Sequence, residues 1–272
     1  MNDSIHRLRV YLIARNNAKL GFEGHLIRAF FLSLLAEADT NLAESLHSSG
    51  YYEMSPYSIK PLMRASFNKH SIHISAPPIR REERYSFEIV ILETKLLRPI
   101  LNALSNAIGS TLEIGNATFE LSEIFIDTVK INELLWNEPK RKISIIFITP
   151  TYFKSRERSG LILLPLSECV ISSAARIWNT FISRDYDTKK LGELARKNII
   201  ITAHEIRTIK PIRISKGRVM IGFVGRVTYE ILDKNLAETF IKLVKLAEIT
   251  NVGGGRTAGF GVIKILKMEP WE

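Results

Sequence analysis

Hydrophobic and polar positions follow two similar series along the chain, and each series predicts the same order of strands and helices. In the first, the apolar run Leu8–Ala14 predicts a strand, and apolar residues recur at helical spacing over Leu26–Glu37. Two alternating segments, a second helical pattern and an extended, hairpin-like stretch complete it: Ser71–Ser75, Tyr85–Ile91, Leu97–Ile108 and Thr111–Ile126. This order is β-α-β-β-α-β.

The second series begins at Ile143–Thr149, a nearly continuous apolar run that is typical of a strand buried on both faces. A helical pattern over Val170–Phe181 follows it. Next come two strands joined at Lys216–Gly217, a helix and a last strand: Ile199–Ile214, Arg218–Ile231, Leu236–Ala247 and Phe260–Leu266. The β-α-β-β-α-β order is therefore repeated.

A polar segment at residues 132–141, which contains Pro139, lies between the two series and is the candidate linker. We therefore predict an α+β protein, a tandem of two ferredoxin-like (RRM-like) βαββαβ domains at residues 1–131 and 142–272. A single larger α+β domain is the alternative.

Composition and charge narrow the functional classes. The 272 residues carry a formal net charge of +10, which favours a polyanionic partner such as nucleic acid over a basic but unspecialised surface. Cys169 is the only cysteine, so neither an internal disulfide nor a cysteine-based zinc site is expected. The polar N-terminus and the lack of a long apolar run predict a cytoplasmic protein without membrane contact.

The segment Asn251–Lys264 contains five glycines within nine residues, between a predicted helix and a predicted strand. Dinucleotide-binding and P-loop motifs have the opposite order, strand before glycines and helix after them, so no nucleotide cofactor is expected. Two interpretations stay open. The segment is either a tight structural turn, or a loop that packs against an RNA backbone with Arg256 and Lys264 near phosphates.

Several motifs, in order along most of the chain, resemble the RAMP superfamily, and within it the CRISPR repeat-RNA processing endoribonucleases. The glycine loop, reading G-x-G then G-F-G before V-I-K-I, is similar to the superfamily signature. Other similar segments are FITPTYF, the helix from Pro165 to Trp178, GRVMIGFVGRVTY, and the L-A-x-x-L-H pattern: residues 147–153, 165–178, 217–229 and 42–47. One departure is the spacer between Gly255 and Gly259, which is shorter than in many members.

The resemblance implies an endoribonuclease that cleaves repeat RNA without metal or cofactor. The 2′-hydroxyl beside the scissile phosphate attacks it and leaves a cyclic phosphate and a 5′-hydroxyl. Such chemistry needs a base for the 2′-hydroxyl, an acid for the departing oxygen, and cations for the developing charge. Histidine suits the first two roles because its pKa lies near neutrality.

The resemblance also supplies candidate residues. His47 matches the family's L-H position, and His25 lies at the start of the preceding helix, where other branches place their histidine. The first helix lacks the family's tyrosine, and Tyr51, or its neighbour Tyr52, is the expected substitute. Expected RNA contacts come from the glycine loop and the second hairpin: Gly253, Gly254, Gly255, Arg256, Gly259, Gly261, Lys264, Lys210 and Arg213.

Three functions remain open on the sequence. The first is cleavage of CRISPR repeat RNA by a monomer or homodimer. The second is a non-cleaving RAMP protein that holds RNA among the proteins of a CRISPR effector complex. The third is a basic α+β structural or ribosome-associated protein.

Overall fold

The computed structural model describes residues 3–47, 54–62, 64–68, 71–75, 77–135, 138–155, 159–215 and 218–271, of which 64–68, 71–75, 215 and 218 are described by their backbone alone. The chain forms two compact units. The N-terminal unit is Asn2–Val129 together with Thr257–Gly259, and the C-terminal unit contains Lys130–Arg256 and Phe260–Glu272. Three residues of the glycine loop thus pack with the N-terminal unit.

The N-terminal unit is built on a five-stranded sheet in the order β2-β5-β1-β7-β6. The strands, in that order, are Tyr57–Lys60, Arg84–Ile91, Ser4–Ala14, Ala117–Lys130 and Thr111–Ile114. Leu8 of β1 lies opposite Ile89 of β5, and Ile59 of β2 lies on the other side of Ile89, with antiparallel pairing in both cases. Without the short β6, this is the strand order of a ferredoxin-like fold.

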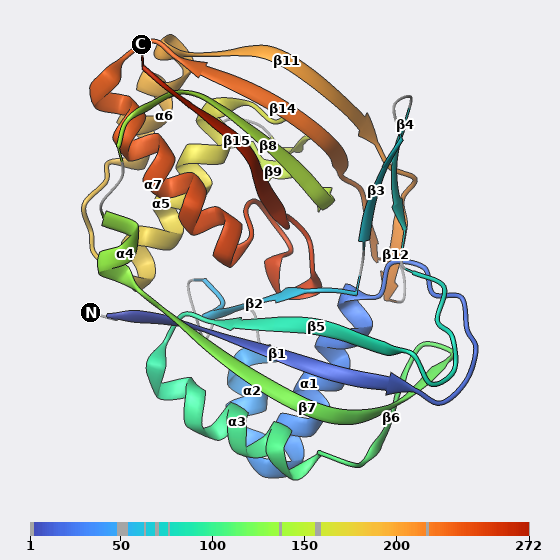
Figure 1. The fold of residues 1–272 in the computed structure, drawn as a ribbon. Coiled ribbons are helices and arrows are strands. Elements are labelled where there is room, and N and C mark those ends of the chain that lie inside the picture. Colours follow the sequence, from blue (N-terminus) through green and yellow to red (C-terminus); the bar gives the residue numbers. More distant parts are fainter. Residues whose placement is uncertain are drawn as a thin grey trace. The chain divides into compact units, whose positions relative to one another are not determined.

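Alternation along β1 explains why this sheet has one apolar and one polar face. Leu8, Val10 and Leu12 are fully buried in the hydrophobic core, whereas Arg7 and Arg9 extend from the opposite face. Helices α1 (Gly24–Ala38), α2 (Thr40–His47) and α3 (Leu97–Asn106) lie on one side of the sheet (Figure 1). The apolar stripe of α1 at four-residue spacing, Ile27, Phe31 and Leu35, is buried in the same core.

One predicted strand exists but does not lie in the main sheet, where the sequence pattern places it. Ser71–Ser75 is β4, and it pairs with β3 (Arg64–Asn68) in a separate two-stranded sheet instead of joining the main one. The strand beside β5 is β2, whose four residues are too short to show an alternating pattern. Tyr57, Ser58 and Ile59 are nevertheless all buried, because β2 is covered on both faces.

The C-terminal unit repeats the strand order with a four-stranded sheet, β11-β14-β8-β15. These strands are Ile199–Thr208, Phe223–Ile231, Lys140–Thr151 and Ile263–Pro270. The helices α5 (Ser167–Phe181) and α7 (Lys234–Thr250) pack against each other, and α7 also packs against β8. Ile145 of β8 lies between Val227 and Ile265 of its two neighbours, which explains the continuous apolar run. The predicted α+β tandem of ferredoxin-like folds is therefore confirmed.

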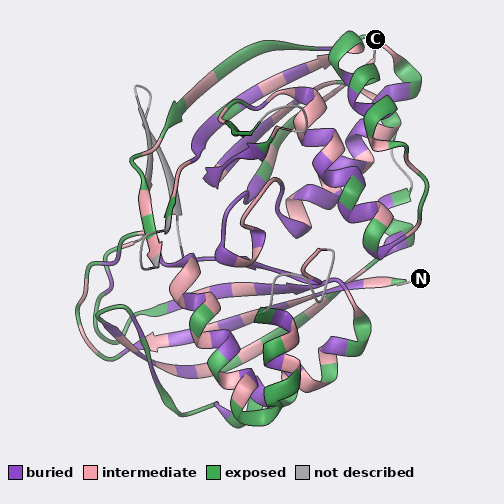
Figure 2. Ribbon diagram, turned by 180° about the vertical axis from the view of Figure 1, so that it is seen from behind, coloured by how far each residue is buried: buried purple, intermediate pink, exposed green. Residues whose placement is uncertain are grey.

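The C-terminal unit also departs from the sequence pattern. Helix α6 (Thr188–Asn198) was not predicted. Its buried stripe is narrow and the rest of its sequence is polar, so the apolar periodicity of a helix is weak there. The predicted long hairpin is interrupted: β12 (Ile212–Ser215) and β13 (Arg218–Met220) form a separate two-stranded sheet beyond β11 and β14. Pro211 lacks the amide hydrogen that a continuous strand would use. Strand β11 is exposed along most of its length (Figure 2).

Short elements connect these parts: η1 (Thr94–Leu96), α4 (Ile131–Leu135), β9 (Phe153–Lys154), β10 (Leu161–Ile162) and η2 (Arg256–Ala258). The predicted linker overlaps the end of α4 and the start of β8. In the described part of the chain, every helix is too short or too polar to cross a membrane.

Candidate active site and glycine-rich loop

The glycine-rich loop connects α7 to β15, and much of it serves its own packing in the C-terminal unit. The amide of Gly253 donates to Ser173 Oγ at 2.8 Å, and that of Gly254 donates to the carbonyl of Tyr152 at 3.0 Å. Gly261 donates to the carbonyl of Pro150 at 3.0 Å. The amides of Gly254 and Gly261 therefore hold the loop at the end of β8, and that of Gly253 holds it on α5.

Two of the glycines have no room for a side chain. A Cβ on Gly261 would lie 1.8 Å from the carbonyl oxygen of Val252, and one on Gly253 would lie 2.4 Å from that of Tyr152. Both residues also have positive φ angles, 75° and 78°. The loop therefore forms a tight structural turn, which was one of the two interpretations of the sequence. This does not decide whether the loop also contacts RNA.

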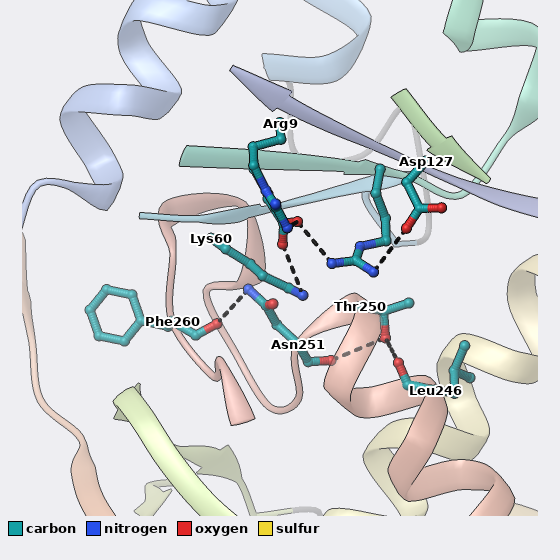
Figure 3. Close-up of polar contacts among 9 residues, drawn as sticks. Arg9, Lys60, Asp127, Leu246, Thr250, Asn251 and Phe260 are labelled. Carbon is teal, nitrogen blue, oxygen red and sulfur yellow. Dashed lines mark hydrogen bonds and ion pairs between the residues drawn. The ribbon is translucent and has the colours of Figure 1, made fainter. Parts of the chain in front are cut away.

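Arg256 is inside the loop and is not a surface cation. Its side chain is 6% exposed, and its Nη1 donates to the carbonyl of Thr250 at 3.1 Å. Burial, with a smaller contribution from Arg176, lowers its pKa to about 10, so the guanidinium remains charged at neutral pH. Nearby, Asn251 Nδ2 donates to the carbonyl of Phe260 at 3.2 Å (Figure 3). Arg256 therefore closes the turn around the end of α7.

The other predicted RNA-binding cations are exposed. Lys264 lies on β15 opposite Ile146, Lys210 lies between β11 and β12, and Arg213 lies on β12. Their exposure leaves them available to phosphates, in contrast to Arg256.

The loop residues Thr257–Gly259 pack against the start of α1 within the N-terminal unit. A Cβ on Gly24 would lie 2.3 Å from the carbonyl oxygen of Ala258 and 3.0 Å from Cα of Gly259. Gly259 has a φ of 81° and also approaches Pro61. The contact is backbone on backbone, so the sequence must have glycine on both sides of it.

A buried tyrosine adds a polar contact to this junction. Tyr57 is fully buried, and its hydroxyl accepts a hydrogen bond from Arg28 Nε at 3.2 Å and also bonds the side chain of Thr257. Burial raises the pKa of Tyr57, and the charge of Arg28 partly offsets that change. Tyr57 therefore joins α1, β2 and the loop.

His25 lies in the first turn of α1, beside Gly24. The ring is half-buried and stacks on Phe22, with centroids 6.4 Å apart. Its Nδ1 is buried and makes no hydrogen bond to any residue that the structure describes. Burial lowers the pKa of His25, so the neutral imidazole predominates at pH 7. A neutral imidazole is suited to accept a proton, and because Nδ1 is buried, the nitrogen left for this role is Nε2.

Glu23 immediately precedes this turn and was not singled out from the sequence. It is fully buried, and neither carboxylate oxygen makes a hydrogen bond of good geometry to a described residue. Burial raises the pKa of Glu23 to about 7. The backbone amides of Glu23 itself and of Leu62 act to lower the pKa and offset only part of this increase. We call the residues gathered here the α1 site: Glu23, Gly24, His25, Arg28, Tyr57 and Thr257–Gly259.

The remaining predicted catalytic residues lie elsewhere. His47 is the exposed last residue of α2, and Tyr51 and Tyr52 lie outside the described residues. The sequence analysis did not identify three residues of the α1 site: Arg28, Tyr57 and Thr257. They come from α1, β2 and the glycine loop, and a sequence motif around a histidine does not show that these three segments meet. Among the residues that the structure describes, no three His, Cys, Asp or Glu side chains gather as metal ligands would.

A second group of charges lies on the polar face of the N-terminal sheet, and we call it the Glu88 cluster. Glu88 forms ion pairs with Arg7 at 2.9 Å, Arg9 at 3.1 Å and Lys60 at 3.2 Å (Figure 3). Arg7 also pairs with Asp127 at 3.1 Å. Burial acts to raise the pKa of Glu88, but Lys60 and Arg7 outweigh it and lower the pKa to about 2.

The chain is similar to known proteins in both sequence and fold. Residues 145–263 match the family model of the CRISPR-associated endoribonuclease Cas6. A comparison with curated protein sequences gives no significant match. The region that matches the family model includes most of the glycine loop and the second half of β8, the strand that supports it.

Solved structures extend the likeness to almost the whole chain. A Cas6 (TTHB231) product complex superposes with a TM-score of 0.74 at 20% identity, over 96% of this chain and 100% of the other. A Cas6 (TTHA0078) product complex gives 0.73 at 19% identity, over 97% and 100%. The structure titled Thermus thermophilus Cas6 (TTHB231) gives 0.71 at 18% identity, over 98% and 100%.

At these identities the structural likeness establishes the fold, and the family model supplies the sequence relationship in the C-terminal part. The resemblance inferred from the motifs is therefore confirmed: the chain is similar to the CRISPR-associated endoribonuclease Cas6 in sequence over residues 145–263 and in fold over almost its whole length.

Proposed function

We propose that this protein binds CRISPR repeat RNA and cleaves it to release guide RNAs, and that His25 takes part in the chemistry. The observation that carries the proposal is the α1 site, where a half-buried, neutral histidine directly follows Gly24, whose backbone contacts Ala258 and Gly259 of the loop. The relationship to the Cas6 family supplies the substrate class.

His25 suits the role of general base. The neutral imidazole accepts the proton of the 2′-hydroxyl while the 2′-oxygen forms its bond to the adjacent phosphorus. The bond from phosphorus to the 5′-oxygen breaks, and that oxygen takes a proton from an acid. The products are a 2′,3′-cyclic phosphate and a 5′-hydroxyl. Because the nucleophile belongs to the RNA, the reaction needs no metal-activated water.

A second group must supply the proton to the 5′-oxygen. His47 and Tyr51 stay the candidates for that role, as in the sequence interpretation. Arg28, which donates to Tyr57 in the α1 site, is the cation nearest to His25 along α1. A guanidinium there suits the charge that develops on the phosphate oxygens.

We propose that phosphate contacts outside the α1 site come mainly from exposed side chains. Lys264, Lys210 and Arg213 are all exposed, whereas the amides of Gly253, Gly254 and Gly261 already have protein acceptors. The glycine loop would then act mostly as a rigid support that presents its neighbours to RNA.

The decisive test is incubation of the purified protein with its repeat RNA in excess EDTA. We expect cleavage at one position, a cyclic phosphate on the upstream product, and no cleavage when the nucleotide before the cut is 2′-deoxy. Cleavage of the deoxy substrate would overturn the mechanism. Tight binding without cleavage would instead support a non-cleaving RAMP subunit, and absence of binding would support a structural or ribosome-associated role.

A further inference from the structure

Glu23 is an unusual residue for the place it occupies. Its side chain is 0% exposed, and both oxygens lack a hydrogen bond of good geometry among the described residues. A buried carboxyl without a partner is costly to a fold unless it is neutral or has a role. Its position is therefore informative, because it directly precedes the turn that carries His25.

The backbone of Glu23 is part of the α1 start. Its carbonyl accepts hydrogen bonds from the amides of Leu26 at 2.8 Å and Ile27 at 2.9 Å, although its side chain caps no helix amide. The next residue, Gly24, is in backbone contact with Ala258 and Gly259. A displacement of the Glu23 side chain would therefore move the first turn of α1, and with it both His25 and the loop contact.

The charged and titratable groups around Glu23 do not neutralise it. The charged or titratable side chains in the first turns of α1 are His25 and Arg28, and those of β2, which contacts α1, are Tyr57 and Lys60. Arg28 is hydrogen-bonded to Tyr57, Lys60 pairs with Glu88, and the segment Thr257–Gly259 has no ionisable side chain. None of these groups contributes to the pKa of Glu23, which burial alone raises.

We propose that Glu23 is a positioning residue of the cleavage site, whose uncharged side chain keeps the first turn of α1 and the loop segment Thr257–Gly259 together around His25. This inference rests on the proposed function. When Glu23 ionises, a carboxylate without a described cation is left in the packed junction, and the junction loosens. Cleavage therefore loses efficiency on the alkaline side, beyond any effect of His25.

The test compares single-turnover cleavage by the wild type and by Glu23→Gln from pH 5.5 to pH 9. The amide is neutral at every pH and has the shape of the protonated acid, so the variant should match the wild type near pH 6. If the ionised form is inactive, the rate ratio of variant to wild type should rise to about tenfold one pH unit above the pKa of Glu23. The acid limb due to His25 cancels in this ratio. Glu44→Gln, on the exposed face of α2, is the control and should give a ratio of one throughout.

A ratio that stays constant with pH would overturn the proposal, because a carboxyl that only fills space has no pH signature. Glu23→Ala leaves a cavity, so this variant should cleave more slowly than the wild type at every pH. Cleavage by Glu23→Ala at the wild-type rate would also contradict the positioning role of Glu23.

Failure of the inference can be separated from failure of the proposed function. Hydrogen exchange of the peptide spanning residues 252–262 needs no cleavage. At pH 8 we expect faster exchange in the wild type than in Glu23→Gln, and at pH 6 equal exchange. Equal exchange at both values would overturn the positioning role even if the RNA is cut. Absence of cleavage with the expected exchange difference would overturn the nuclease assignment alone.

Discussion

The N-terminal unit contains a buried glutamate, Glu23, and a partly buried one, Glu88, in opposite electrostatic situations. Glu88 is surrounded by Arg7, Arg9 and Lys60, and its pKa is lowered to about 2, so it is charged at any physiological pH. Glu23 has no described ion-pair partner, and its pKa is raised to about 7. One carboxylate is fixed in a single charge state, and the other is poised between two.

The difference distinguishes a structural group, the Glu88 cluster, from the α1 site, for which we propose a role in cleavage. The Glu88 cluster ties β1, β5, β2 and β7 together on the polar face of the sheet, where paired charges replace apolar packing. In the α1 site, a histidine nitrogen and a carboxyl lack a hydrogen bond of good geometry to any residue that the structure describes, at some cost in stability. Groups left unsatisfied and with shifted pKa values are typical of sites that handle protons.

The largest expected effect is the loss of cleavage activity when the histidine of the α1 site is replaced. His25→Ala should lower the cleavage rate by roughly 10²–10⁴ and leave RNA affinity nearly unchanged, because it removes a general base. His47→Ala is the matched variant, and single-turnover rates at saturating protein are the measurement. A rate near wild type for His25→Ala, with a strong loss for His47→Ala, would move the base to the end of α2.

The next effect concerns stability in the Glu88 cluster. Glu88→Gln should lower the free energy of unfolding by about 2–4 kcal/mol, because it leaves Arg7, Arg9 and Lys60 without their shared carboxylate. Urea denaturation at pH 7 measures it, with Glu113→Gln on exposed β6 as the control. Cleavage by the folded fraction should be unchanged. A loss below about 0.5 kcal/mol would make the cluster no more than a surface network.

A third effect distinguishes the two glutamates by pH. The pKa of Glu23 rises from 4.5 to about 7 on folding, so the native state binds the proton more tightly. Its contribution to stability is present below pH 4.5 and is lost as the pH rises to 7, by at most roughly 3 kcal/mol. Glu88 has the opposite sign: its contribution is present above pH 4.5 and is lost as the pH falls through about 2.

Unfolding free energies of Glu23→Gln and wild type, compared at pH 5 and pH 8, measure this third effect. The variant should gain on the wild type as the pH rises. A difference that is independent of pH would show that Glu23 keeps its ordinary pKa in the folded protein, and would remove the contrast with Glu88.

The sequence predicted the fold better than the site, for physical reasons. Apolar periodicity repeats over many residues, so β1, α1 and β8 were recognisable, whereas the four-residue β2 carried too little pattern. His25 and His47 were both candidates because a histidine's chemistry is evident from its residue type, and the sequence favoured His47. Glu23 and Tyr57 were not candidates, because their importance comes from burial and from long-range contact with Thr257. Arg256 is the opposite case: the sequence suggested an RNA contact, but the side chain is hydrogen-bonded within the loop.

The smallest expected effect concerns the cations near the loop. Lys264→Ala should weaken repeat-RNA binding a few-fold and reduce the slope of log affinity against log salt by about 0.7–0.9, the value for loss of one phosphate contact. The reason is that Lys264 is exposed on β15. Lys197→Ala on exposed α6 removes the same charge elsewhere and is the matched control.

Arg256→Ala completes the comparison, because Arg256 is buried in the glycine loop whereas Lys264 is exposed on β15. Its guanidinium is buried and donates to the carbonyl of Thr250, so its loss should lower the melting temperature and leave the salt slope unchanged. Binding measured well below that melting temperature, from 50 to 300 mM salt, separates the two effects. A slope reduced by Arg256→Ala and unchanged by Lys264→Ala would mean that the loop opens on binding RNA and that Arg256 leaves Thr250 for a phosphate.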